Sequence, residues 1–135
     1  MSNADTLARH IAAENAHDVQ GIVDTFAADG ALVLNGQTFR GRDLIRRAHE
    51  GFGFAEHGSF ADIKVEELRR FTTADTIVVE ERLSARHVGT WDGVPASGRS
   101  LEVQVCAVYQ FDAAGLLVSE RVYFDGAGLL KQLGR

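Results

Sequence analysis

The feature that most constrains this chain is a row of apolar side chains at alternate positions in the stretch 98–111. Every second side chain in this stretch is apolar or aromatic, namely Leu101, Val103, Val105, Ala107, Tyr109 and Phe111. Successive side chains of a strand point to opposite faces of a sheet, so this row predicts one buried face. The alternation is typical of an antiparallel sheet that packs one side against a core.

Three more segments of the second half have the character of strands, at 60–72, 76–89 and 116–125. The linkers TTAD, GTWDGVPASG and DAAG separate the four strands, and all three have the composition of turns and loops. Strands that follow one another along a chain usually pair. The second half is therefore predicted to form a meander of four long strands.

The first half has the 3.6-residue period of helices. One helix is predicted to begin near Asn3 or Asp5, a second to span 19–26 before a stop at 29–30, and a third to span 42–52. Between the last two, the dipeptide 35–36 is Asn-Gly and predicts a hairpin turn, because both residue types tolerate positive φ. The glycine-rich segment 51–59 predicts a mobile loop.

Helices followed by a strongly curved antiparallel sheet predict an α+β fold, in which the sheet wraps around the helices as a cone. The length of 135 residues suits a single domain over residues 1–135. The outward sheet face keeps Cys106 and Val108 among polar residues, and the helices cannot cover it. We therefore expect a homodimer formed sheet to sheet.

Composition argues against several classes of function. The net charge is −5, from 19 acidic and 14 basic residues, and no basic stripe is present, so nucleic acid is not an expected partner. Cys106 is the only cysteine, which argues against a disulfide framework and a cysteine-based metal cluster. Asp5, Arg9 and Glu14 interrupt the N-terminal segment where a signal peptide needs an apolar core. We expect a soluble, cytoplasmic protein with no membrane contact.

Four stretches carry a resemblance to a known family: AHDVQGIVDTFAADGALV, FRGRDLIRR, HVGTWDGVPASGRS, and YFD followed by GLLKQLG. In this order and spacing they resemble the SnoaL-like polyketide cyclase branch of the nuclear transport factor 2-like superfamily. The resemblance covers nearly the whole chain. It implies a cone-shaped α+β barrel with an interior cavity for a small molecule.

The resemblance also implies an activity and its residues. Cyclases of this family use a pocket acid to activate a carbon acid for aldol ring closure, without metal or cofactor. The matching acid here is Asp125, and the matching histidine is His87. The implied function is a cofactor-independent acid/base enzyme on a small carbonyl or polyketide-like substrate, with His87 or Arg121 stabilising the enolate. Family members often carry aromatic residues at the positions of Arg121 and Glu81, so this pocket is predicted to be more charged.

Glu81 also stands out from the residues alone, because it interrupts an apolar row of the strand at 76–89. A buried unpaired charge is costly, so Arg121 is the expected ion-pair partner. Phe52 and Trp91, near the expected mouth of the pocket, and Tyr109, on the buried face, are the other predicted substrate-binding residues.

Each assignment has a structural alternative. Asp125 can be a turn residue before a glycine, and His87 a structural histidine with its hydrogen bonds satisfied. Glu81 and Arg121 can form a purely structural ion pair, and Trp91 can be ordinary packing. The remaining histidines, His10, His17, His49 and His57, have no spacing suited to metal ligation, so helix-surface or loop positions and no metal are expected.

Two alternative functions remain open. EERLS, SGRSLEVQVCAVYQF and RVYFD are similar to limonene epoxide hydrolases of the same superfamily, and Arg82 and Asp125 fit that pattern, with Ser84 where an acid is expected. The other alternative is a non-catalytic module that binds a small molecule or dimerises.

Overall fold

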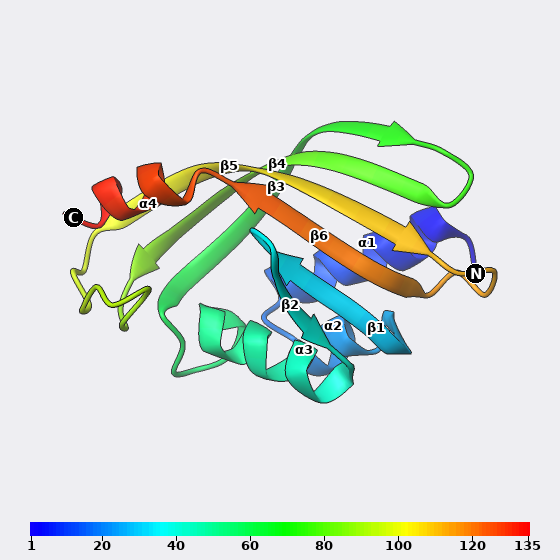
Figure 1. Cartoon of the computed structure of the whole chain (residues 1–135), viewed down its shortest axis with the longest axis horizontal. Helices are drawn as coiled ribbons and strands as arrows, with labels where there is room; N and C mark the ends of the chain where they lie inside the picture. The colour runs from blue at the N-terminus through cyan, green and yellow to red at the C-terminus, as the bar shows by residue number, and fades with distance from the viewer.

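The computed structural model describes residues 1–135 and consists of one sheet with helices packed against it (Figure 1). The helices are α1 (Asn3–Asn15), α2 (Val19–Val23), α3 (Arg42–His49), the π-helical turn η1 (Glu50–Phe54) and α4 (Gly126–Gln132). The strands are β1 (Phe26–Leu34), β2 (Gln37–Arg40), β3 (Phe60–Thr72), β4 (Thr76–His87), β5 (Ser100–Phe111) and β6 (Leu117–Phe124). None of the helices has the length and apolar character needed to cross a membrane.

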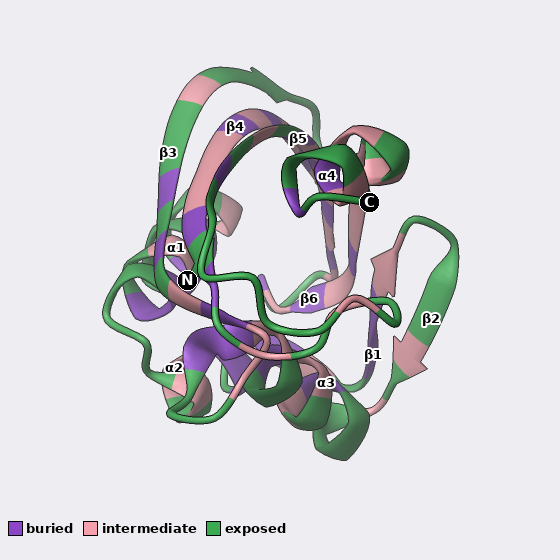
Figure 2. Ribbon diagram, turned by 90° about the vertical axis from the view of Figure 1, so that its left-hand side faces the viewer, coloured by how far each residue is buried: buried purple, intermediate pink, exposed green.

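The sheet has six strands in the order β2-β1-β6-β5-β4-β3. Strands β3 to β6 form the predicted antiparallel meander, and β1 adds to β6 in parallel. Figure 2 shows β3 to β6 bending into an arc, with α1, α2 and α3 across its open side. This arrangement confirms the predicted α+β fold, in which the sheet wraps around the N-terminal helices.

Local sequence explains where several elements begin. Ser2 caps α1 by accepting a hydrogen bond from the backbone of Asp5, whose carboxylate faces the backbone of Ser2 in return. Asp18 caps α2 through the backbone N–H of Gly21. The predicted hairpin turn joins β1 to β2, with φ of 45° at Asn35 and 90° at Gly36.

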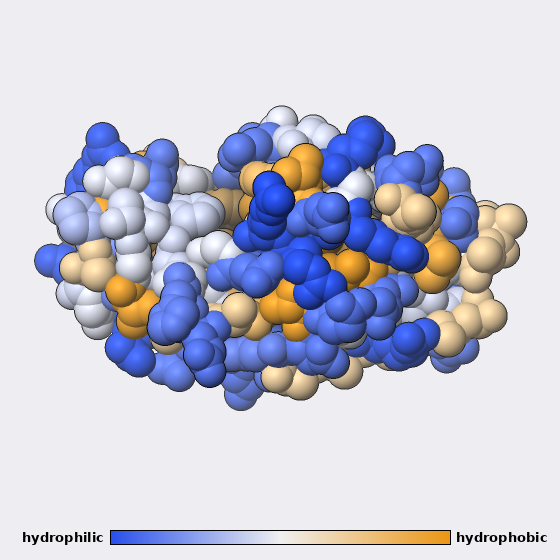
Figure 3. Space-filling view, turned by 90° about the horizontal axis from the view of Figure 1, so that it is seen from below, coloured by the Kyte–Doolittle hydropathy of each residue, from blue (hydrophilic) through white to orange (hydrophobic).

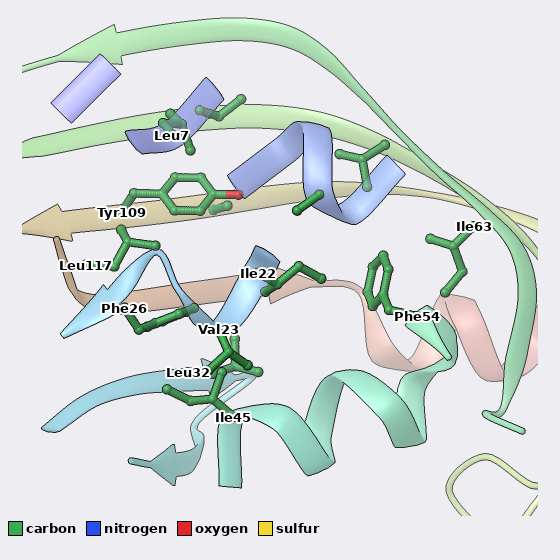
Figure 4. Close-up of a cluster of buried hydrophobic side chains, with 14 of the residues drawn as sticks. Leu7, Ile22, Val23, Phe26, Leu32, Ile45, Phe54, Ile63, Tyr109 and Leu117 are labelled. Atoms are coloured by element: carbon green, nitrogen blue, oxygen red, sulfur yellow. The ribbon is translucent and has the colours of Figure 1, made fainter. Parts of the chain in front are cut away.

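The inner face of the sheet and the helices share one hydrophobic core. The predicted alternation of β5 is confirmed, since Leu101, Val105, Ala107, Tyr109 and Phe111 are all buried. Figure 4 shows Tyr109 between Leu7 of α1 and Leu117 of β6, with Phe54 and Ile63 at the far side of the same cluster. The core therefore joins the helices to β3 as well as to β5 and β6.

Helix α3 is amphipathic and directs two residues inward. Ile45 and His49 are four residues apart and both buried, whereas Asp43 and Arg47 on the other side are exposed. The helical side seen from below in Figure 3 is largely hydrophilic, with hydrophobic side chains visible between the polar ones. His49 consequently points into the interior from the last turn of α3.

Two predicted boundaries are wrong, and one helix was not predicted. Phe26 begins β1 instead of ending the second helix, because it pairs with Leu117 of β6. The helix at 42–52 continues into η1, so part of the predicted loop is helical; Gly53, with φ of 142°, lies within η1. The sequence reading placed no helix after residue 125, where α4 packs against β5.

Candidate functional site

A cavity of about 80 Å³ lies between the inner face of the sheet, the end of α3, η1 and α4. Of its 20 lining residues 16 are hydrophobic, and the other four are Glu14, His49, Glu81 and Glu120. Tyr109, which also lines the cavity, adds a hydroxyl group to these four side chains. Ionisable groups gathered in an otherwise apolar cavity are the usual mark of a functional site.

Glu81 on β4 and Tyr109 on β5 form a hydrogen-bonded pair. The Tyr109 hydroxyl donates to Glu81 Oε1 at 3.1 Å, and only 4% of Glu81 is exposed. Burial, and then the negative charges of Glu14 and Glu120, raise the pKa of Glu81 from 4.5 to about 8. Burial, and then the negative charges of Glu120, Glu81 and Glu14, raise the pKa of Tyr109 well above 10. Both groups are therefore protonated at neutral pH.

His10 of α1 lies behind the cavity and is completely buried. Its Nε2 is 3.2 Å from Glu120 Oε1 and 3.6 Å from Glu14 Oε2. Burial alone lowers the pKa of His10, but the charges of Glu120 and Glu14 outweigh it and raise this pKa well above 6.5. Burial in turn favours the neutral form of Glu120, but His10 outweighs it, so the pKa of Glu120 is lowered. Glu120 is consequently ionised at neutral pH.

His49 lies beside His10, with ring centroids 6.4 Å apart. Its Nδ1 is 2.8 Å from the carbonyl oxygen of Ile45, which can only accept, so Nδ1 carries the proton. The Nε2 of neutral His49 therefore has a free lone pair. One donor atom from each of His10, His49 and Glu120 lies within 4.8 Å of the others.

This arrangement combines a neutral carboxyl group with an ionised carboxylate in one apolar cavity. Glu81 can donate a hydrogen bond or a proton, while Glu120 can only accept. Carboxyl groups whose environments push their pKa values apart are typical of acid/base catalysis. The chemistry that the site supports is therefore proton transfer to and from a bound molecule.

Three of the predicted site residues line the cavity: Glu81, Tyr109 and Phe52. Trp91 does not line it, and instead packs against Phe52 and Phe60 with ring centroids 5.4 and 5.2 Å apart. Trp91 thus supports the aromatic wall of the cavity from outside, as the packing alternative predicts.

Asp125 is exposed and lies outside the cavity. Its carboxylate caps α4 by accepting a hydrogen bond from the backbone N–H of Gly128 at 2.9 Å. The expected carboxylate in a pocket is not found at this position, because the chain continues into a helix whose first turn needs an acceptor. A catalytic role for Asp125 stays a prediction that its position does not support.

Arg121 lies on the outer face of β6. It donates to Gln110 Oε1 at 3.2 Å and to Ser119 Oγ at 2.8 Å. The even-numbered residues Glu120 and Val122 line the cavity, so Arg121 points to the opposite face. The predicted ion pair between Arg121 and Glu81 is therefore wrong.

His87, at the end of β4, is buried but outside the cavity lining. Its Nδ1 accepts a hydrogen bond from the backbone N–H of Ser97 at 3.2 Å and lies 2.8 Å from Ser97 Oγ. These contacts join the loop after β4 to the strand end. The structural alternative is met only in part, because Nδ1 has partners in Ser97 whereas Nε2 is buried without a hydrogen-bond partner. The catalytic role of His87 stays a prediction.

Sequence reasoning missed Glu120, His10 and His49, and the expected helix-surface or loop position is wrong for both histidines, which are buried. Glu120 carried a usable signal, since it interrupts the apolar row of Val118, Val122 and Phe124 as Glu81 does in β4. Glu14 was visible in the apolar stripe of the first helix. The histidines carried no such signal, because they meet only when α1 and α3 pack.

The epoxide hydrolase pattern is not assembled at the cavity. Arg82 lies on the outer face of β4 and contacts Glu66 at 3.4 Å and Glu102 at 3.3 Å. Neither Arg82 nor Asp125 lines the cavity.

Solved structures with this fold cover nearly the whole chain. A candidate SnoaL-like polyketide cyclase from Jannaschia sp. CCS1 has a TM-score of 0.86 and 18% identity, over 97% of this chain and 90% of that one. A candidate polyketide cyclase from Silicibacter sp. TM1040 has a TM-score of 0.87 and 20% identity, over 99% and 96%. TsrD from Streptomyces laurentii has a TM-score of 0.82 and 24% identity, over 97% and 93%. At these identities the likeness shows the fold alone.

In sequence, no curated protein matches the chain. The family model described as SnoaL-like polyketide cyclase, in contrast, matches residues 4–133. This match spans all the elements that build the cavity. The chain belongs to the SnoaL-like polyketide cyclase family.

Proposed function

We propose that this protein is an acid/base enzyme of the cyclase or isomerase type, acting on a compact carbonyl compound in the cavity. The observation that carries the proposal is the Glu81–Tyr109 pair, buried in an apolar cavity beside Glu14 and Glu120. A volume of about 80 Å³ suits a small substrate or one ring of a larger one better than a flat polycycle.

In the proposed reaction the substrate carbonyl oxygen accepts a hydrogen bond from protonated Glu81. Glu14 removes a proton from the neighbouring carbon, and the electron pair of that C–H bond forms the enolate. The hydrogen bond from Glu81 stabilises the charge on oxygen as it develops. In a cyclase the enolate carbon then attacks a second carbonyl of the same molecule, and the alkoxide that forms takes the proton from Glu14. In an isomerase a conjugated enolate takes that proton back at a different carbon.

Glu14 is the better candidate for the base. Its Oε1 is buried without a hydrogen-bond partner, and Glu14 lines the cavity. Glu120 is held closer to His10, at 3.2 Å compared with 3.6 Å, and its lowered pKa makes it a weaker base. Tyr109 acts through Glu81, which it positions by its hydrogen bond.

Enolisation can be measured before the natural substrate is known. We expect the protein to accelerate exchange of the acidic C–H protons of small cyclic ketones and 1,3-diketones in D₂O, followed by proton NMR. Glu14→Gln should slow this exchange about 10²- to 10⁴-fold, the range for a general base. Glu81→Leu should slow it about 10²- to 10³-fold, as for the loss of one oxyanion donor.

Glu80→Gln is the matched control, because Glu80 neighbours Glu81 but faces the other side of β4, where it pairs with Arg69. This variant should keep the wild-type exchange rate. Binding of the ketones without faster exchange would contradict the enzyme proposal and favour a small-molecule binding module.

A further inference from the structure

Two imidazoles and one carboxylate converge behind and beside the cavity. One donor atom from each of His10, His49 and Glu120 lies within 4.8 Å of the others, and all three residues are buried. The shortest separation, 3.2 Å, joins His10 Nε2 to Glu120 Oε1. Metal ligands around one tetrahedral Zn²⁺ lie about 3.3 Å apart, given bonds of about 2.0–2.1 Å. The His10–Glu120 separation already has this value.

The second nitrogen of each imidazole has a fixed partner. Thr25 Oγ1 donates its proton to the carbonyl of Ile22 at 2.6 Å, so at 2.9 Å it must accept from His10 Nδ1. His49 Nδ1 donates to the carbonyl of Ile45 at 2.8 Å. Both rings therefore present Nε2 to the cluster. Histidine ligands of metals are oriented in this way, with the other ring N–H held by an acceptor.

The central atoms of the cluster lack hydrogen-bond partners. His10 Nε2 and Glu120 Oε1 are both buried and unpartnered although they are only 3.2 Å apart, so the oxygen lies off the direction of a hydrogen bond. Glu14 Oε1 is buried and unpartnered as well. Buried polar atoms without partners are rare and costly. This arrangement is expected of metal ligands, because ligand atoms point at the ion between them and not at one another.

We propose that His10, His49 and Glu120 bind one divalent transition metal ion of the Zn²⁺ type. Two imidazole nitrogens and one carboxylate oxygen suit such an ion better than Mg²⁺, which prefers oxygen ligands. The widest donor pair must close from 4.8 Å by small side-chain movements. Glu120 and His49 line the cavity, so a fourth coordination position opens toward a bound molecule, as in catalytic zinc sites.

This site goes beyond the proposed function and departs from the expectation of a metal-free cavity. Its ligands are not Glu14 or Glu81, so acid/base chemistry by those residues remains possible with the ion bound. The ion would take the place of the proton that His10 Nε2 holds between the two carboxylates, and its charge would offset theirs. Metal binding is measured without substrate, and its failure is therefore distinguishable from failure of the enzyme proposal.

The test is titration of the chelator-treated full chain with Zn²⁺ by calorimetry, and with Co²⁺ by visible absorption. We expect one Zn²⁺ per chain, an intense tetrahedral Co²⁺ spectrum and no comparable binding of Mg²⁺. Glu120→Gln and His49→Gln should each weaken Zn²⁺ binding by more than about 100-fold. Thr25→Val, which removes only the acceptor behind His10, should weaken it about 10- to 100-fold.

His57→Gln is the control for adventitious binding, because the His57 side chain is 94% exposed and remote from the cavity lining. This variant should bind Zn²⁺ as the wild type does. Circular dichroism checks that each variant is folded. If a substitution at a buried ligand prevents folding, the wild-type titration still tests the proposal. Absence of stoichiometric Zn²⁺ binding, equal binding of Mg²⁺, or loss of binding in His57→Gln would each overturn the proposal.

Discussion

At the scale of residues, one carboxyl group is the most informative. Glu81 sits in an apolar strand row, and its burial leaves the charged form without the water that would stabilise it. Arg121 does not compensate, because it points to the other face of the sheet. The charge of His10 favours ionised Glu81, but burial and the charges of Glu14 and Glu120 outweigh it. The Tyr109 hydroxyl supplies a single hydrogen bond. The neutral acid is thus the form that this site favours.

The raised pKa of Glu81 predicts a pH dependence of stability. Between 4.5 and about 8 the folded protein keeps this proton and the unfolded chain releases it. The free energy of unfolding should therefore fall as pH rises through this window and level off above it. Glu81→Gln keeps the acceptor for Tyr109 and removes the titration. The variant should be more stable than wild type at pH 8, by on the order of a few kcal/mol at most.

Urea denaturation of both proteins from pH 5 to pH 9, with EDTA present throughout, measures this difference. The two stability curves should be close near pH 5 and separate toward pH 8. Parallel curves over the whole range would show that Glu81 ionises freely in the folded protein. Glu102→Gln, on the outer sheet face with its side chain 65% exposed, should follow the wild-type curve.

At the scale of elements, the end of β6 and the start of α4 decide what Asp125 does. The strand ends at Phe124, and Asp125 supplies the acceptor that the first turn of α4 requires. The backbone N–H of Gly128 is the donor. In this position the carboxylate of Asp125 serves as a helix cap.

Asp125→Ala should therefore lower the free energy of unfolding by about 0.5–2 kcal/mol, because the cap is lost. Asp125→Asn should change it little, since asparagine is an equally good cap. Both variants should keep wild-type ketone exchange. Denaturant titration and the NMR exchange assay are the measurements, and a large loss of exchange in a stable Asp125→Asn variant would restore the catalytic reading.

At the scale of the whole molecule, the outer face of the sheet is the surface that the helices leave uncovered. The register places Phe71 of β3, Val78 of β4 and Val108 of β5 side by side. Two residues before Val108 on the same face of β5, Cys106 lies opposite Tyr123 of β6. Phe71 is 55% exposed and Tyr123 is 46% exposed. This patch supports the expectation of a sheet-to-sheet homodimer, which stays a prediction.

Light scattering at micromolar concentration should give the mass of two chains. Val108→Lys should shift the mass toward one chain, because it places a charge in the middle of the patch. Leu44→Lys, an exposed change on the helical side, is the control and should leave the mass unchanged. A wild-type monomer at this concentration would refute the expectation.

The sequence by itself determined the meander, the hairpin turn and the inner face of β5, because these depend on periods of two and on local turn chemistry. It also identified Glu81, because a single carboxylate in the apolar row of one strand can be recognised without knowing the contacts of that strand. It did not determine the parallel pairing of β1 with β6, which joins residues about ninety positions apart.

Only the tertiary structure decided the contents of the site. His10, His49 and Glu120 come from α1, α3 and β6, and no spacing in the chain relates them. The face of β6 that lines the cavity depends on register. A shift of one residue would turn Arg121 into the cavity in place of Glu120. Asp125 became a helix cap because α4 packs on β5. Local patterns specify the elements, but a site is made by contacts between them, and those depend on packing.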